Sequence, residues 1–170
     1  IRSESFEKIN EIIEQTLVYS LLLAVPASVG IFALSEQIIA VLFERGEFNK
    51  NSSLFTSKAL KFYSLGLVAF ILMKIYTPIF FAYENARPTL HITATNLVIN
   101  TTLSIVLFVN LGFIGIPIAT SISAWISVLL MNYSLYKNNY YQISRRIIFP
   151  GAIIIIVSFI IYLYLIFLEN

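Results

Sequence analysis

The chemically reactive side chains of this sequence are few, and their types exclude most kinds of active site. The 170 residues include no cysteine and no aspartate, and the single histidine is His91. Without thiols, a disulfide framework, a thiolate metal site and a cysteine nucleophile are excluded. The hydroxyl side chains have no aspartate or second histidine to activate them as nucleophiles. We therefore expect no enzymatic activity, no catalytic residue, no metal site and no cofactor.

Lys74 is the one charged residue inside the apolar stretch 62–81. A lysine at the centre of a membrane-spanning helix costs about 2.5–3.5 kcal/mol to insert. Two interpretations are open. The ammonium faces a water-filled or paired site that suits an anionic group, or it snorkels toward the Tyr83 end of the helix. Because snorkelling has to cover about two turns, or ~11 Å, the sequence favours the wet or paired site.

Polar residues recur on one face of the stretch 89–109, at spacings of three or four. They are Thr89, Thr93, Asn96, Asn100 and Ser104. A polar stripe in lipid points into the protein, where it lines a cavity or bonds to neighbouring helices. Bonding is the commoner role. The sequence therefore favours helix bonding for the stripe, and Asn96 and Asn100 are the candidates if it lines a substrate cavity instead.

Small residues recur at every fourth position of the stretch 113–133. They are Gly115, Ala119, Ser123 and Ser127. This spacing lets two helix backbones approach closely in a membrane. We interpret the series as a helix-packing face and assign it no further role.

The composition explains why these residues need membrane-spanning elements to position them. Hydrophobic residues make up 58% of the chain and charged residues 12%, against about 25% charged residues in an average soluble domain. The mean hydropathy is +0.84. This excludes an ordinary cytosolic enzyme and a disordered tail. A net charge of +2 is too small to bind a phosphate backbone, so we expect no nucleic acid partner.

The sequence predicts an all-α fold, a polytopic transmembrane helical bundle. About 20 residues of helix cross the hydrocarbon layer, and backbone groups in lipid must be paired within each segment. Five stretches meet this length, at residues 16–34, 62–81, 89–109, 113–133 and 147–168. The predicted organisation is an amphipathic cytoplasmic lead-in, a four-span segment, a cytoplasmic loop and a further transmembrane helix, at 1–15, 16–136, 137–146 and 147–170. Both ends look cut, so we expect a part of a longer transporter-like chain.

A short helix is expected between the first two spans, with Ser35 as its cap and Gly46 as its breaker. Lys and Arg in the loops give the orientation. The side of the lead-in has six of them, and the opposite side has four: Arg2, Lys8, Arg87, Lys137, Arg145 and Arg146 against Arg45, Lys50, Lys58 and Lys61. This bias places the lead-in in the cytoplasm and the loop with Arg45 and Gly46 outside.

Several ordered segments resemble motifs of the MurJ (MviN) lipid II flippase family. The segment Val25–Gly30, then Ile38–Phe43 and the loop Phe43–Phe48, are similar to the family pattern "LPA…G…II..LF.RGAF". Further matches follow in the correct order at Ala59-Leu60, Tyr63, Gly66-Leu67, Lys74, Phe80–Ala82, Gly112–Gly115, Ala119–Ser121 and Ala124-Trp125. Together they cover about residues 16–136.

The resemblance implies about five spans, helices nine to thirteen, of a fourteen-helix exporter fold in the bacterial inner membrane. This is the carboxyl-terminal part of a protein that moves lipid-linked peptidoglycan precursor outward by alternating access. The implied partners are lipid II, membrane lipids and an amino-terminal lobe of the same chain. Arginines that grip the substrate in family members lie outside this sequence. Within it, Lys74 is the cationic cavity candidate, Arg87 lies at the cytoplasmic mouth, and Arg45 and Gly46 form the periplasmic loop motif.

Two other functions remain open at this stage. One is export of another cargo, either another polysaccharide-lipid or, in a drug antiporter, a drug. An antiporter should have acidic residues in its spans, and these spans have none. The other is a membrane scaffold that transports nothing, in which Lys74 and the polar stripe only hold helices together.

Overall fold

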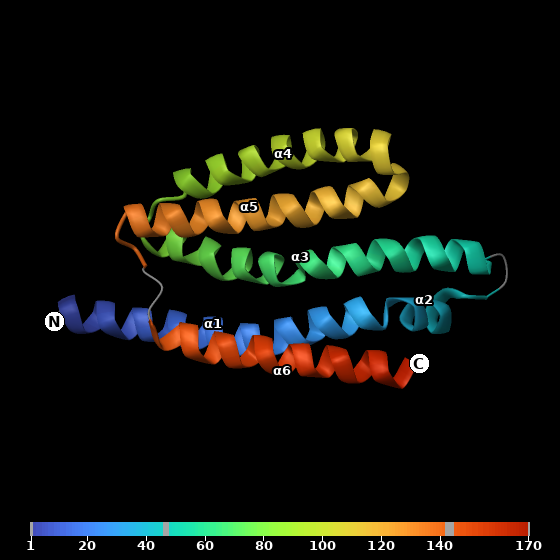
Figure 1. Ribbon diagram of the computed structural model, residues 1–170. Coiled ribbons are helices and arrows are strands. Elements are labelled where there is room, and N and C mark those ends of the chain that lie inside the picture. Colours follow the sequence, from blue (N-terminus) through green and yellow to red (C-terminus); the bar gives the residue numbers. More distant parts are fainter. Residues whose placement is uncertain (1, 46–47, 142–144, 170) are drawn as a thin grey trace.

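The computed structural model describes residues 2–45, 48–141 and 145–169, and the side chains within 8–45, 48–141 and 147–167. Its described residues form helices and no strand. Figure 1 shows the helices: α1 (Arg2–Ala33), α2 (Ser35–Phe43), α3 (Lys50–Ala82), α4 (Arg87–Leu111), the 3-10 turn η1 (Gly112–Ile114), α5 (Gly115–Lys137) and α6 (Arg145–Glu169). The predicted all-α fold is confirmed.

The amphipathic lead-in and the first span form one continuous helix, α1. It has 32 residues, which gives a length of about 48 Å against a hydrocarbon layer of about 30 Å. The backbone is helical across the expected boundary between residues 15 and 16. The change from an amphipathic to an apolar sequence at this boundary therefore marks a change in the surroundings of one continuous helix.

Four helical stretches are long and apolar enough to cross a membrane: Lys8–Ala33, Lys50–Ala82, Arg87–Lys137 and Ile147–Phe167. The third has 51 residues and contains both α4 and α5. These two helices lie side by side after a reversal at η1. The third stretch is thus a hairpin of two antiparallel arms, which correspond to the predicted spans 89–109 and 113–133.

The long helices lie in a row whose order differs from their order in the chain. Neighbouring pairs are α6 with α1, α1 with α3, α3 with α5, and α5 with α4, as Figure 1 shows from bottom to top. The short helix α2 packs against α3. Because α3 is in the middle of this row, its neighbours on the two sides are α1 and α5.

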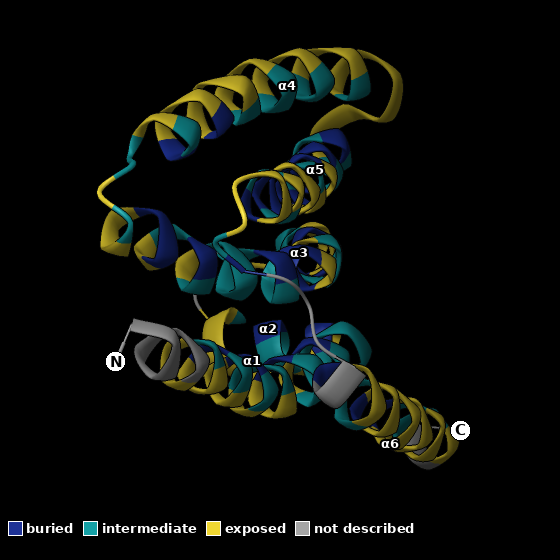
Figure 2. Ribbon diagram, turned by 90° about the vertical axis from the view of Figure 1, so that its left-hand side faces the viewer, coloured by how far each residue is buried: buried dark blue, intermediate teal, exposed yellow. Residues whose placement is uncertain are grey.

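Apolar side chains cover the outer faces of the row, which Figure 2 shows as exposed. Leu23 is 75% exposed and Phe167 is 78% exposed. Such surfaces are stable where acyl chains are the solvent. The buried core is formed mainly by α1, α3 and α5 and includes Leu17, Phe80 and Leu135.

The helix ends follow the expected caps only in part. The Asn49 side chain caps α3 by accepting a hydrogen bond of 3.0 Å from the Ser52 backbone N–H. The expected cap Ser35 is wrong, because Leu34 precedes α2 without a side-chain cap and Ser35 is the first helical residue, fully buried. The expected breaker Gly46 lies outside the described residues.

Glycine makes the α4–α5 hairpin possible at two positions. Gly112 has φ of +66°, a backbone conformation that residues with a side chain rarely adopt. At Gly115, a Cβ atom would collide with the carbonyl group of Leu107 and lie 2.7 Å from the Phe108 nitrogen. The backbones of α4 and α5 therefore meet at Gly115 without room for a side chain.

Candidate functional site

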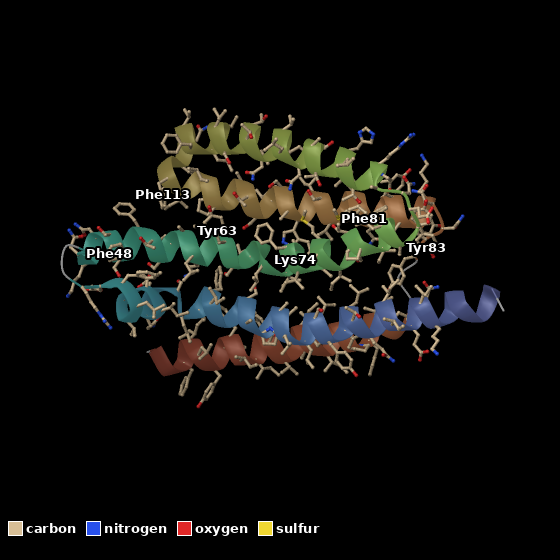
Figure 3. All side chains as sticks on the ribbon, turned by 180° about the vertical axis from the view of Figure 1, so that it is seen from behind. Phe48, Tyr63, Lys74, Phe81, Tyr83 and Phe113 are labelled. Carbon is tan, nitrogen blue, oxygen red and sulfur yellow. The ribbon has the colours of Figure 1, made fainter. Side chains whose placement is uncertain are left out.

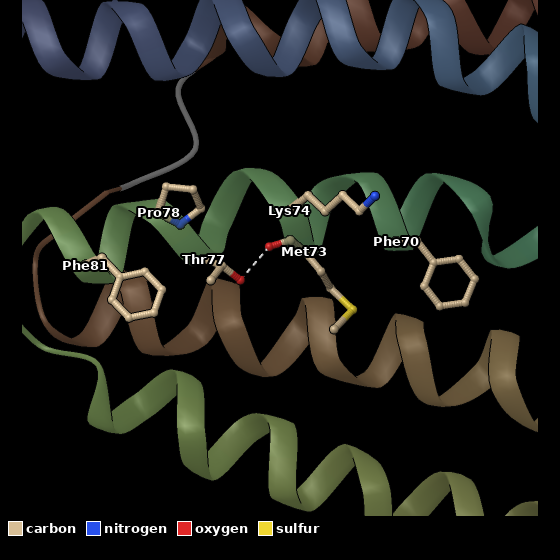
Figure 4. Close-up of a pocket in the computed structure, with 6 residues that line it drawn as sticks. All are labelled: Phe70, Met73, Lys74, Thr77, Pro78 and Phe81. Carbon is tan, nitrogen blue, oxygen red and sulfur yellow. Dashed lines mark hydrogen bonds between the residues drawn. The ribbon is translucent and has the colours of Figure 1, made fainter.

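Lys74 lies on an open face of α3 and borders a hollow of about 560 Å³. The other lining residues come from the same helix: Phe70, Met73, Thr77, Pro78 and Phe81 (Figure 4). The one hydroxyl among them is satisfied, because Thr77 Oγ1 donates to the Met73 carbonyl at 2.8 Å. Lys74 is exposed, and its ammonium is the only charged group among these six lining residues.

A second hollow of about 340 Å³ lies on the other side of Lys74, between α1 and α3. Its α1 wall consists of Ile9, Ile12, Ile13 and Thr16. Among the described residues, no acidic side chain lines either hollow. Lys74 therefore stands between two apolar hollows as a positive charge with no carboxylate in their described walls.

The direction of the Lys74 side chain bears on the two interpretations of this residue. In Figure 4 it extends along α3 toward Phe70, away from Pro78 and Phe81. Side chains of an α-helix tilt toward the helix N-terminus, and this direction leads away from the nearer helix end at Ala82. In this conformation the ammonium does not snorkel toward Tyr83. Figure 3 places it between Tyr63 and Phe81 along α3.

The two asparagines of the polar stripe lie away from Lys74, on α4. The Asn100 Oδ1 atom accepts a hydrogen bond of 3.1 Å from Ser104 Oγ of the same helix. Thr120 Oγ1 of α5 lies 3.5 Å from Asn100 Oδ1, but it donates to the Ile116 carbonyl at 3.0 Å. The Asn96 Oδ1 atom is buried and, within the described part of the chain, has no hydrogen-bond partner. Asn100 is thus bonded within α4 and has one long contact with α5, and no described α4 residue lines either hollow beside Lys74.

The remaining site candidates lie near opposite ends of the long helices. Arg87 is exposed and begins α4. Arg45 is exposed and follows α2, while Gly46 lies outside the described residues. Neither arginine lines a hollow with Lys74. The structure therefore leaves Lys74 as the charged candidate at mid-helix depth.

The small residues of α5 are all buried: Gly115, Ala119, Ser123 and Ser127. The two serine hydroxyls donate to carbonyls of their own helix, Ser123 to Thr120 and Ser127 to Ser123, each at 3.0 Å. Their hydrogen-bonding capacity is met without reaching a neighbour. Their contribution to the bundle is the small volume of their side chains, which lets neighbouring helices pack closely.

Sequence reasoning missed the bonds that hold α3 between its neighbours. Ser121 Oγ donates to the Phe62 carbonyl at 2.7 Å, and the Trp125 indole N–H donates to the Leu65 carbonyl at 2.9 Å. Trp125 is 41% exposed, so it is only partly packed in the bundle. A Cβ on Gly66 would lie 2.8 Å from Ser121 Oγ. Gly66 was the local signal of this close contact between α3 and α5.

Sequence reasoning also missed an aromatic contact between the α3–α4 turn and the α5–α6 connection. The Tyr83 and Tyr140 rings stack with centroids 4.2 Å apart and planes 6° apart. Asn85 Nδ2 donates to the Tyr140 hydroxyl at 3.1 Å. The next residue, Tyr141, is 3% exposed, and burial, with the charge of Glu14, raises the pKa of its phenol. The phenol therefore stays neutral at physiological pH.

The described residues contain no group of His, Cys, Asp and Glu that could hold a metal ion. A family model described as "Lipid II flippase MurJ" matches residues 2–170. The chain belongs to the MurJ lipid II flippase family.

Relatives named "Probable lipid II flippase MurJ" agree with this assignment. The protein of Rickettsia prowazekii is 44% identical over 115 residues, which are 67% of this chain and 23% of that protein. The protein of Rhizobium tropici is 32% identical over 150 residues, which are 86% of this chain and 28% of that protein. The chain thus spans about a quarter of the length of these curated relatives.

A solved structure, "Lipid II flippase MurJ, inward closed conformation", has the same arrangement of helices. Its TM-score is 0.79 at 28% sequence identity, and the match covers 93% of this chain and 33% of that one. The predicted polytopic bundle and its MurJ resemblance are confirmed. The chain is therefore a multi-pass membrane segment that belongs to the MurJ lipid II flippase family.

Proposed function

We propose that this chain forms part of a lipid II flippase of the bacterial inner membrane. The flippase moves lipid-linked peptidoglycan precursor from the cytoplasmic to the periplasmic face by alternating access, and it has no enzymatic activity. The family match over residues 2–170 carries the proposal. The chain corresponds to about a third of the solved flippase. From the motifs that its sequence shares with the family, we assign it to the carboxyl-terminal lobe. Its partner is then an amino-terminal lobe of the same protein.

In this proposal Lys74 attracts the anionic head group of the substrate. An ammonium is a compact charge with three donors on a flexible stem, and here it stands on an apolar wall whose described residues include no carboxylate. The interaction is stronger beside such a wall than in bulk water, because the local dielectric constant is lower. Asn96, whose Oδ1 atom lacks a partner among the described residues, stays a cavity candidate. Asn100, whose Oδ1 atom is bonded within α4, is assigned a structural role.

The bonds across α3 suit a lobe that moves as one body. Ser28 Oγ of α1 donates to the Ser64 carbonyl at 2.6 Å, while Ser121 and Trp125 bond α3 from the α5 side. Alternating access in transporters is largely rigid-body rocking of one bundle against another. Bonds within this bundle keep Lys74 in a fixed place while the lobe moves.

The orientation follows from the loop charges. We place the α3–α4 turn with Arg87 and the α5–α6 connection in the cytoplasm, and the loop after α2 with Arg45 in the periplasm. Arg87 then stands at the cytoplasmic mouth. This agrees with the excess of Lys and Arg that cytoplasmic loops carry.

The test is rescue of a bacterial strain in which the resident lipid II flippase is depleted. The complete protein that carries this chain is expressed, and labelled lipid II reaching the outer face of the inner membrane is measured. We expect restored outward movement and normal cell shape. A protein that reaches the membrane at a normal level but leaves lipid II inside contradicts the proposal.

A further inference from the structure

A second kind of site lies near α2, toward the end of the bundle where α1 ends and α3 begins. A groove of about 330 Å³ opens between α1, α3 and α6. It is lined by Val25, Ser28, Val29, Phe32, Leu65, Ile155, Ser158, Phe159 and Tyr162. Lys74 is absent from this lining, so the groove is separate from the candidate substrate site.

The groove offers apolar surface, although two serines line it. Ser28 Oγ donates to the Ser64 carbonyl at 2.6 Å, and Ser158 Oγ donates to the Ile154 carbonyl at 2.7 Å. Both residues are buried. Since both hydroxyl protons are used within the protein, the groove suits a hydrocarbon chain better than a polar ligand.

A positive charge lies at one end of this apolar groove. Lys61 Nζ is 4.9 Å from the centroid of the Phe32 ring, and the Phe32 and Tyr162 rings contact each other with centroids 6.1 Å apart. Lys61 immediately precedes the apolar stretch 62–81, and Phe32 is one residue from the end of α1. Lys61, Phe32 and Tyr162 form the mouth of the groove. Lys61 and Phe32 place it near the membrane boundary, and Tyr162 lies inside the apolar stretch Ile147–Phe167 of α6.

The other end of the groove is deeper in the hydrocarbon layer. From Phe32 to Val25 the α1 wall descends about 10 Å at 1.5 Å per residue. On α6, Ile155 lies at a similar separation from Tyr162. An apolar groove of this length that starts at a cation suits the upper part of one acyl chain below a phosphate group.

We propose that this groove binds one acyl chain of an anionic glycerophospholipid, with the lipid phosphate at Lys61. Among the described side chains, the contact of the Lys61 ammonium is with the Phe32 ring, so its N–H donors remain available to a phosphate. Lys58, one turn earlier on α3, adds a second positive charge at the same end. This lipid is a resident of the bilayer and is distinct from the transported cargo.

The test uses the complete protein in nanodiscs of phosphatidylcholine. A trace of phosphatidylglycerol carrying a photoreactive acyl chain is added, cross-linked by light and mapped to peptides. We expect labelling of the segments 25–32 and 155–162. Lys61→Gln should lower this labelling about fivefold, the effect of one lysine near an anionic lipid surface. The matched control, Lys50→Gln on the same helix, should leave it unchanged.

A second variant tests the groove itself. Ile155→Trp, at an exposed position of the groove lining, narrows the groove and should reduce labelling by photoreactive phosphatidylglycerol and phosphatidylcholine alike in protein that remains monodisperse. Equal labelling of wild type and Lys61→Gln would overturn the proposal, and so would the absence of label from both segments. Displacement of the label by lipid II would assign the groove to the cargo and overturn it as well. None of these experiments measures transport, so they can succeed or fail independently of the flippase proposal.

Discussion

At the scale of single residues, the position of Lys74 is the feature with the clearest functional meaning. Its ammonium extends toward Phe70, along the helix and away from the nearer end (Figure 4). The insertion cost of about 2.5–3.5 kcal/mol is therefore not relieved by snorkelling in this conformation. Water or an anionic group in the hollow beside α3 is the remaining way to offset it.

If the hollow beside Lys74 is open to water, as the proposed function requires, the variant Lys74→Cys should react with a charged, water-soluble thiol reagent. Val98→Cys on α4 is the matched control. Val98 is exposed and lines neither hollow beside Lys74, so we expect it to face acyl chains and its thiol to stay unreactive. The chain has no native cysteine, so each variant carries one thiol within it. The measurement is the extent of labelling in intact membranes, with other thiols of the protein removed. If the Lys74→Cys thiol reacts only after the protein is denatured, the wet hollow is refuted.

At the scale of elements, the helices were predictable and their bonds were not. Every backbone group in lipid has to be paired within its own helix, so the length of apolar runs such as 113–133 nearly determined the spans. The acceptors for Ser121 and Trp125 are backbone carbonyls at Phe62 and Leu65. Since every residue has a carbonyl, nothing in the sequence marks these two as acceptors. Gly66 indicates that α3 and α5 approach closely, but only the fold shows which donor meets which acceptor.

The α4–α5 hairpin depends on the absence of one Cβ atom. Gly115→Ala should destabilise the protein by about 2 kcal/mol, as overpacking does, because the new methyl group meets the Leu107 carbonyl. Gly30→Ala in α1 is the matched control, since no atom lies within 4 Å of its added Cβ. It should be neutral or stabilising by up to about 1 kcal/mol. Thermal unfolding of the detergent-purified proteins measures both, and equal stability of the two variants would argue against the close approach.

At the scale of the whole molecule, the order in which the helices lie side by side could not be predicted from the sequence. A short link joins α4 to α5, and these two helices are neighbours, but the short turn between α3 and α4 does not make those two neighbours in the row. However, α6 packs on α1, far away in the chain, and α3 separates α1 from α5. This order creates the groove between α1 and α6 and leaves the Lys74 face of α3 open.

Cysteine pairs can test the order of the row. Phe32→Cys with Tyr162→Cys should be joined by a short bifunctional thiol reagent, because the two native rings contact each other with centroids 6.1 Å apart. Phe32→Cys with Val109→Cys should not, because α3 and α5 lie between α1 and α4. Gel mobility after proteolysis between the two sites distinguishes the outcomes. A link in the second pair with none in the first would require a different arrangement of helices.

The transport claim meets its most direct test in outward movement of labelled lipid II by Lys74 variants of the complete protein, compared at equal membrane level. Losing a charge-assisted contact costs about 1.5–3 kcal/mol, so Lys74→Ala should lower the rate about tenfold or more. Lys74→Arg, which keeps the charge, should retain most of it, and Lys50→Ala should match wild type. A Lys74→Ala protein that moves lipid II at the wild-type rate would remove this residue from the mechanism.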